Sequence, residues 1–83
     1  MLVDVVQVEV LDKHRLRLAF DDGTEGIVDI ASLVPFVGVF APLRDPAVFA
    51  QVRVDAELGT VVWPNGADID PSVLHERAMQ AGA

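Results

Sequence analysis

The chain has 83 residues, enough for one small domain, and 52% of them are hydrophobic. Its 13 acidic and 6 basic residues give a net charge of -7, which argues against nucleic-acid binding because that needs clustered lysine and arginine. It has no cysteine, which excludes disulfides and thiolate metal sites and fits the reducing cytoplasm. It shows neither the basic start of a signal peptide nor the ~18 apolar residues of a membrane span, so we expect no membrane association.

Two β-strands are predicted before residue 21. Residues 3–11 alternate apolar and polar side chains, with a slip of one residue at Val5-Val6 that a β-bulge would accommodate. Residues 14–20 alternate without interruption, so we expect Leu16, Leu18 and Phe20 to share one buried face.

The Asp-Gly pair at positions 22 and 23 predicts a hairpin that leads into a third strand. A two-residue loop would set Leu16 opposite Asp29. A three-residue loop with Gly23 in the left-handed region would set Leu16 opposite Val28 and Arg15 opposite Asp29. We favour the second register, because it pairs apolar with apolar residues and opposite charges with each other. The acids at positions 21, 22 and 25 could suggest a metal loop, but the turn preferences of Asp and Gly favour a solvated hairpin tip.

Residues 31–42 are apolar but are interrupted by two prolines and a glycine, so they cannot form one long helix. We expect a connection that contains a short helical turn. Its large apolar side chains either join the core or form a patch that a partner covers. The candidate interaction surface consists of Phe36, Val37, Val39 and Phe40.

A short helix is predicted over residues 45–51, because Asp45 is a good N-cap and Pro46 suits the first helical position. Strand alternation resumes at residue 52. A loop of four or five residues that closes on Gly59 then leads into a fifth strand over residues 60–63.

The fifth strand ends at Trp63, which we expect in the core, because the following proline cannot donate to a strand ladder. Asn65-Gly66 predicts a tight turn with positive φ at both residues. Asp70 followed by proline repeats the helix start, and we expect a last helix over residues 71–79 that buries Val73 and neighbouring apolar side chains.

Three short motifs follow one another between about residue 5 and residue 74. They are Phe20-x-Asp22-Gly23, Pro42-Leu43-x-Asp45 and Trp63-Pro64-Asn65-Gly66-x-Asp68. With these motifs the chain resembles the family catalogued as domain of unknown function 2442. The resemblance implies a small bacterial or archaeal α+β domain with no established activity and no catalytic residue, so we expect the motif residues to be structural. Some members look like N-terminal domains fused to a helix-turn-helix, and others are encoded beside another small protein, as toxin–antitoxin pairs are. The fused form is not expected here, since nothing after Ala83 could form a helix-turn-helix.

The best cluster for chemistry is Asp68, Asp70, His75 and Glu76, but it offers too few converging oxygens for a metal ion. His14, near a strand start, is expected to face solvent. No Ser-His-Asp order or glycine-rich phosphate loop is present, and a chain this small cannot enclose a pocket unaided. We therefore predict no catalytic, cofactor-binding or metal-binding residue.

The predicted fold is α+β, with one domain whose core runs from about residue 3 to residue 79. We expect a mainly antiparallel five-stranded sheet with two short helices on one face, in two layers. The leading hypothesis is a non-catalytic protein-interaction module, the antitoxin-like partner of a small basic protein encoded beside it. The alternative is a small enzyme or ligand-binding protein whose site forms across a homodimer. The apolar excess in so small a chain favours assembly, as a homodimer or with another protein.

Overall fold

Nine short elements of secondary structure follow one another in the computed structural model, which describes residues 3–81. The strands are β1 (Val5–Val10), β2 (Arg15–Phe20), β3 (Glu25–Asp29), β4 (Arg53–Asp55) and β5 (Thr60–Val62). The helices are α1 (Ile30–Leu33), the 3-10 helix η1 (Gly38–Arg44), α2 (Pro46–Phe49) and α3 (Pro71–Ala81).

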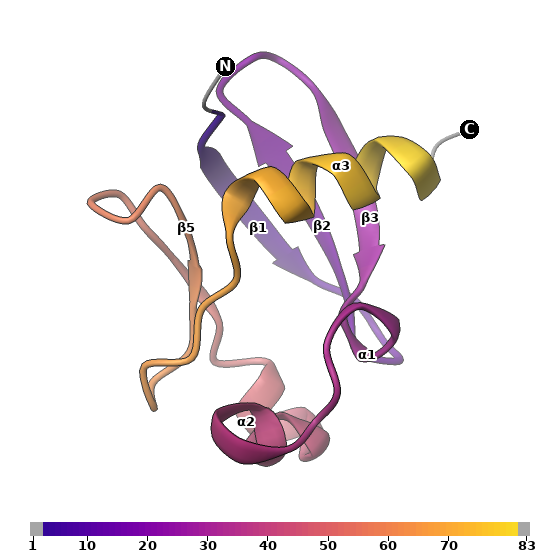
Figure 1. The fold of residues 1–83 in the computed structure, drawn as a ribbon, viewed down its shortest axis with the longest axis vertical. Coiled ribbons are helices and arrows are strands. Elements are labelled where there is room, and N and C mark those ends of the chain that lie inside the picture. Colours follow the sequence, from indigo (N-terminus) through magenta and orange to yellow (C-terminus); the bar gives the residue numbers. More distant parts are fainter. Residues whose placement is uncertain (1–2, 82–83) are drawn as a thin grey trace.

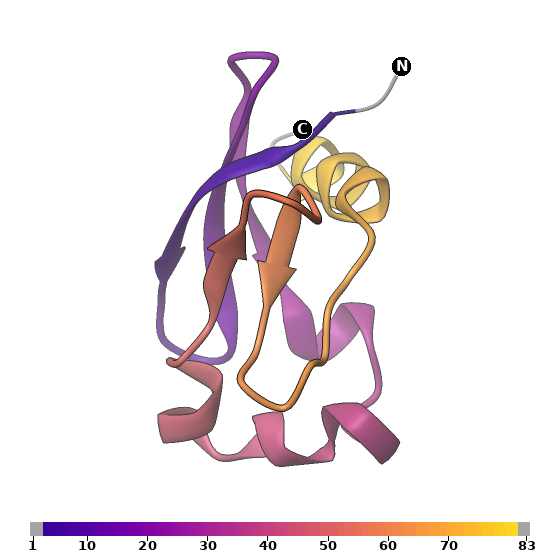
Figure 2. The same ribbon diagram turned by 90° about the vertical axis from the view of Figure 1, so that its left-hand side faces the viewer.

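The five predicted strands are all present, but they form two sheets, so the prediction of one five-stranded sheet is wrong. One antiparallel sheet has the order β1-β2-β3, and β4 pairs with β5 in the other (Figure 1). The cause lies in β1, where the predicted bulge shifts the register between Val5 and Gln7. A bulge bends its strand, and Figure 2 shows β1 running obliquely to β4. Among residues 3–81, one backbone hydrogen bond joins the sheets, from the Val5 N–H to the Gly59 carbonyl at 2.8 Å.

The helices also differ from the prediction of two short helices on one face. Only α3 crosses a face of the three-stranded sheet, whereas α1, η1 and α2 gather at the end away from the β2–β3 turn (Figure 1). The α3 backbone passes directly over β3, since a Cβ at Gly26 would lie 2.8 Å from the Ala78 carbonyl oxygen. The absent side chain is therefore what lets the helix approach the sheet so closely.

The register of the first hairpin is confirmed. Leu16 lies opposite Val28, Arg15 lies opposite Asp29, and Gly23 has a φ of 86°. The Arg15 guanidinium, however, pairs with the Asp12 carboxylate at 2.6 Å. The Asp29 side chain instead accepts the Ala31 N–H and caps α1.

The core lies between α3, the inner face of the three-stranded sheet and the β4–β5 sheet. Leu16, Leu18 and Phe20 are buried as predicted, and Trp63 is only 1% exposed. In α3, Leu74 and Ala78 face the core. Val73 was expected beside them, but it is 43% exposed, because it lies one position away from the buried stripe of the helix.

Candidate functional site

The segment after β5 is held by its own polar side chains. Trp63 donates its indole Nε1–H to the Phe49 carbonyl at 3.0 Å, and Asn65 donates Nδ2–H to the Val39 carbonyl at 2.8 Å. The Asn65 Oδ1 also accepts the Ala67 N–H at 3.2 Å. These contacts tie η1 and α2 to the β5 turn, so Trp63 and Asn65 both have structural roles.

The turn itself corrects one expectation. Gly66 has a φ of 88°, but Asn65 does not adopt positive φ. The Gly66 N–H donates to the Trp63 carbonyl at 2.9 Å, which makes Pro64 the second residue of the turn. Pro64 fixes a negative φ there and leaves Gly66 as the fourth residue, where glycine is favoured.

The two predicted helix caps are confirmed. Asp45 accepts the Ala47 N–H at 2.9 Å, and Asp70 accepts the Ser72 N–H at 2.7 Å. Of the remaining motif residues, Leu43 is fully buried within η1. The helix that Asp45 starts ends at Phe49, two residues earlier than predicted.

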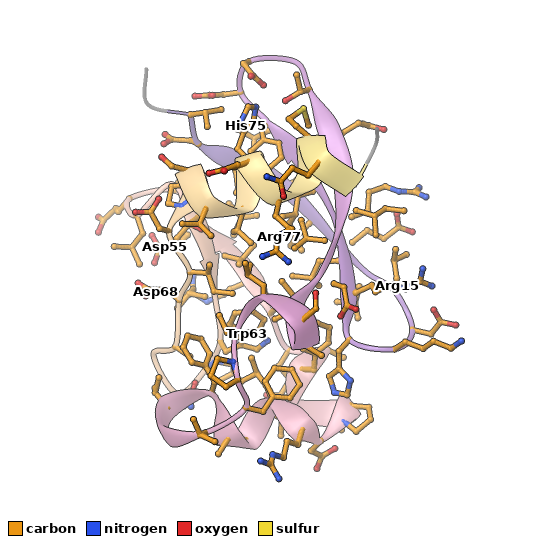
Figure 3. The ribbon with its side chains drawn as sticks, turned by 45° about the vertical axis from the view of Figure 1, so that its right-hand side comes forward. Arg15, Asp55, Trp63, Asp68, His75 and Arg77 are labelled. Atoms are coloured by element: carbon orange, nitrogen blue, oxygen red, sulfur yellow. The ribbon has the colours of Figure 1, made fainter. Side chains whose placement is uncertain are left out.

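The structure does not bring Asp68, Asp70, His75 and Glu76 together. Figure 3 shows His75 near the β2–β3 turn, far from Asp68, which forms a backbone bridge with Val62. Within residues 3–81, no group of three His, Cys, Asp or Glu side chains is arranged to hold a metal ion.

His75 instead contacts the hairpin turn. Its Nε2 lies 3.0 Å from Oδ2 of Asp22, and its ring packs edge-on against Phe20 with centroids 4.9 Å apart. Asp22 also accepts the hydroxyl and the backbone N–H of Thr24. The Thr24 hydrogen bonds, followed by the nearby His75, lower the pKa of the Asp22 carboxyl from its ordinary value. The pair fastens α3 to the turn.

His14 is a half-buried residue whose packing sequence reasoning missed. Its ring lies between Phe36 and Phe49, at centroid distances of 5.2 and 5.0 Å, and within the described chain its buried Nε2 has no hydrogen-bond partner. The expectation of a solvent-facing side chain is therefore wrong. Lys13 and His14 have φ values of 57° and 58°, an unfavourable conformation that turns the ring inward. No local sequence pattern predicts this inward orientation of the His14 ring.

The structure divides the candidate interaction surface. Phe36 and Phe40 are half-buried and pack against the core, whereas Val37 is 57% and Val39 51% exposed. The Val39 carbonyl is held by Asn65 and the Phe36 carbonyl by Arg44, so the backbone of this segment is fixed. The exposed apolar side chains that this segment offers to a partner are Val37 and Val39.

Two open grooves mark the sheets. A groove of about 180 Å³ on the outer face of the three-stranded sheet is lined by Gln7, Glu9, Arg17, Ala19 and Glu25. A groove of about 250 Å³ between β1 and β4 is lined by Asp4, Val5, Val6, Val54, Ala56 and Gly59. Neither lining contains a serine, cysteine or histidine, so neither groove holds a Ser–His or Cys–His pair.

Acidic residues occur in three neighbouring segments, because the start of the chain contacts both the β2–β3 turn and the β4–β5 loop (Figure 2). The Asp4 N–H donates to the Asp21 carboxylate at 3.1 Å, and the Asp4 carboxylate lies against Gly59 of the β4–β5 loop. No lysine or arginine occurs in residues 3–4, 21–25 or 56–59. This acidic end consists of Asp4, Asp21, Asp22, Glu25 and Glu57.

Basic side chains concentrate at the opposite end, in the β1–β2 turn, η1 and the start of β4. They are Lys13, Arg15, Arg44 and Arg53. Arg15 and Arg53 are paired there with Asp12 and Asp55. The molecule therefore has a charge dipole, because the acidic end carries five acids without a lysine or arginine while four basic side chains lie at the opposite end.

Comparison with protein-family models gives one identification. Residues 5–80 match the model described as a protein of unknown function, DUF2442. Comparison with curated proteins and with solved structures gives no match. Within residues 3–81, no helix is long and apolar enough to cross a membrane. Because the match spans nearly the whole chain, the protein belongs to the DUF2442 family.

Proposed function

We propose that the protein is a non-catalytic interaction module that binds a more basic protein through its acidic end. The observation that carries this proposal is the concentration of Asp4, Asp21, Glu25 and Glu57 in three segments without lysine or arginine. Like charges in neighbouring segments repel one another and destabilise the folded chain. A partner of opposite charge removes that repulsion when it binds.

The charge dipole also favours association kinetically. A surface of one sign steers a partner of the opposite sign, and it suppresses encounters with partners of the same sign. Screening limits this attraction to a Debye length of about 8 Å at physiological salt. The binding is therefore expected to weaken as the salt concentration rises.

The proposed partner is a small basic protein encoded beside this one, in an antitoxin-like arrangement in the cytoplasm. A chain without cysteine needs no oxidising compartment, which is compatible with this setting. A homodimer through the exposed Val37 and Val39 would be a different mode of assembly, and the test below separates the two.

The test is capture of the tagged protein from its native cells, with mass spectrometry of the bound protein and titration of the purified pair. We expect a partner of positive net charge, and we expect Glu57→Lys to weaken binding about tenfold because it reverses a charge at the acidic end. Asp68→Lys makes the same change of charge outside the acidic end, so it should weaken binding less than about twofold. Absence of any partner, equal effects of the two variants, or a homodimer alone would overturn the proposal.

A further inference from the structure

We infer that the basic partner binds by adding an extended segment to the free edge of β3. The inference rests on the proposed function and extends its docking surface along β3 from Glu25, the residue that the acidic end and the β3 edge share. In the sheet order β1-β2-β3, β3 is an outer strand, whereas the outer edge of β1 faces β4. Figure 1 shows α3 crossing the face of the sheet, with no described strand beside β3.

The hydrogen bonds of the hairpin determine which backbone groups of β3 are free. The Phe20 N–H donates to the Thr24 carbonyl, and the Ile30 N–H donates to the His14 carbonyl. Antiparallel ladders alternate, so the even-numbered residues of β3 bond to β2 and the odd-numbered residues point their N–H and C=O groups outward. Those odd-numbered residues are Glu25, Ile27 and Asp29.

One of these outward groups is already used. The Asp29 carbonyl accepts the Ser32 hydroxyl at 3.0 Å, where α1 begins. Both backbone groups of Glu25 and of Ile27, with the N–H of Asp29, remain as the edge that an added strand would pair with. An exposed edge of this kind is a template for another strand.

The side chains of β3 determine which kind of strand from a partner would pair with this edge. Glu25, Ile27 and Asp29 project to the same face, because alternate residues of a strand share a face. Neighbouring Arg15 and Arg17 do not neutralise these acids, since they pair with Asp12 at 2.6 Å and Glu9 at 3.4 Å. The edge therefore presents an acid, an apolar residue and a second acid at a spacing of two.

This pattern disfavours a second copy of the chain as the occupant. Two antiparallel copies of β3 centred on Ile27 would place Glu25 directly opposite Asp29 of the other copy, and like charges in that position are destabilising. A strand with basic residues two positions on either side of an apolar residue would instead form opposite-charge pairs at both positions. We therefore assign the edge to a basic, extended segment of a different protein.

The test uses a capped peptide, Ser-Lys-Thr-Val-Thr-Lys-Ser, and a control peptide with both lysines replaced by glutamate. Amide NMR of the whole protein should show that the basic peptide shifts the Glu25, Ile27 and Asp29 signals and slows exchange of the Ile27 amide. Replacing both acids (Glu25→Gln with Asp29→Asn, which keeps a cap acceptor) should weaken peptide binding about fivefold. Asp68→Asn, outside β3 and outside the acidic end, should change it less than about twofold.

Three results would overturn the inference. They are absence of peptide binding, equal binding of the glutamate peptide, and signal changes confined to residues outside β3. A separate arm distinguishes this failure from failure of the proposed function. Ile27→Pro removes an outward N–H at an edge position that tolerates proline. If the captured partner binds this folded variant as well as it binds the original protein, while Glu57→Lys weakens binding, the proposed function stands and the β3 site is wrong.

Discussion

The two sheets of this protein are held in different ways. The three-stranded sheet has strands of six, six and five residues that are consecutive in the chain, and α3 packs over its inner face. The strands of the β4–β5 sheet have three residues each. Its surroundings are fixed by side chains that reach distant carbonyls: Thr60 to Ile69, Trp63 to Phe49 and Asn65 to Val39. A short ladder can thus be positioned by a few hydrogen bonds from side chains to distant carbonyls, whereas a long ladder relies on its backbone pairs.

Trp63→Ala should have the largest effect on stability, because it removes one of the side-chain contacts that position the β4–β5 sheet. It removes a ring that is 1% exposed and leaves the Phe49 carbonyl without its indole donor. We expect a loss of about 3–5 kcal/mol in the free energy of unfolding, measured by urea denaturation. Trp63→Phe keeps most of the apolar volume and should cost clearly less. A loss below about 1 kcal/mol for the alanine variant would contradict this assignment.

The sequence predicts features that depend on neighbouring residues, and it does not predict features that depend on contacts between distant segments. The strands, the first hairpin's register and both aspartate caps depend on residues close together in the chain, and they were predicted correctly. The split into two sheets depends on how the bulged β1 meets β4, which is far away in the sequence. The His75–Asp22 contact and the burial of His14 between two phenylalanines also depend on tertiary packing, so no local pattern encodes them. The sequence did not identify the β3 edge, because the hairpin register alone cannot show that α3 leaves it open, and the predicted surface with Val37 and Val39 stays a prediction.

Gly26→Ala tests the larger sheet by pushing α3 away from β3. The added Cβ would lie 2.8 Å from the Ala78 carbonyl oxygen, which belongs to the helix backbone and cannot rotate away. Overpacking of this kind costs about 1–3 kcal/mol. Hydrogen exchange should quicken in α3 and β3 while the β4–β5 sheet keeps its protection. Unchanged exchange in α3 would show that the helix is not seated on Gly26.

Gly23→Val tests the turn that sets the register of the larger sheet. Gly23 has a φ of 86°, and this conformation is strained for a β-branched residue even though no atom blocks its Cβ. The variant should lose about 1–2 kcal/mol. Gly23→Asn, which tolerates positive φ better, should lose less in the same thermal unfolding measurement. Equal losses for the two variants would indicate that backbone conformation is not the cause.

The smallest effect on stability is expected from substitution of Asp22, whose carboxylate joins the β2–β3 turn to His75 of α3. Hydrogen bonds from Thr24, and then His75, hold its pKa below the ordinary value of 3.8. A carboxyl with a lowered pKa in the folded state stabilises the protein above its unfolded pKa, and this contribution is lost as the pH falls through the folded pKa. Asp22→Asn should therefore flatten the dependence of stability on pH below about pH 4. Identical acid titrations of stability for Asp22→Asn and the original protein would rule out this contribution.

The position of α3 over β3 also sets an order of events during synthesis. The three strands can pair as soon as they leave the ribosome, because they are neighbours in the chain. Their inner face, with Leu16, Leu18 and Val28, is not fully covered until α3 emerges, because Leu74 and Ala78 complete the same core. At about 5–20 residues per second, the delay after Gly26 is roughly 3–10 s. During that interval the nascent chain exposes apolar surface that chaperones recognise, so its yield in cells is expected to depend on how fast the codons of α3 are translated.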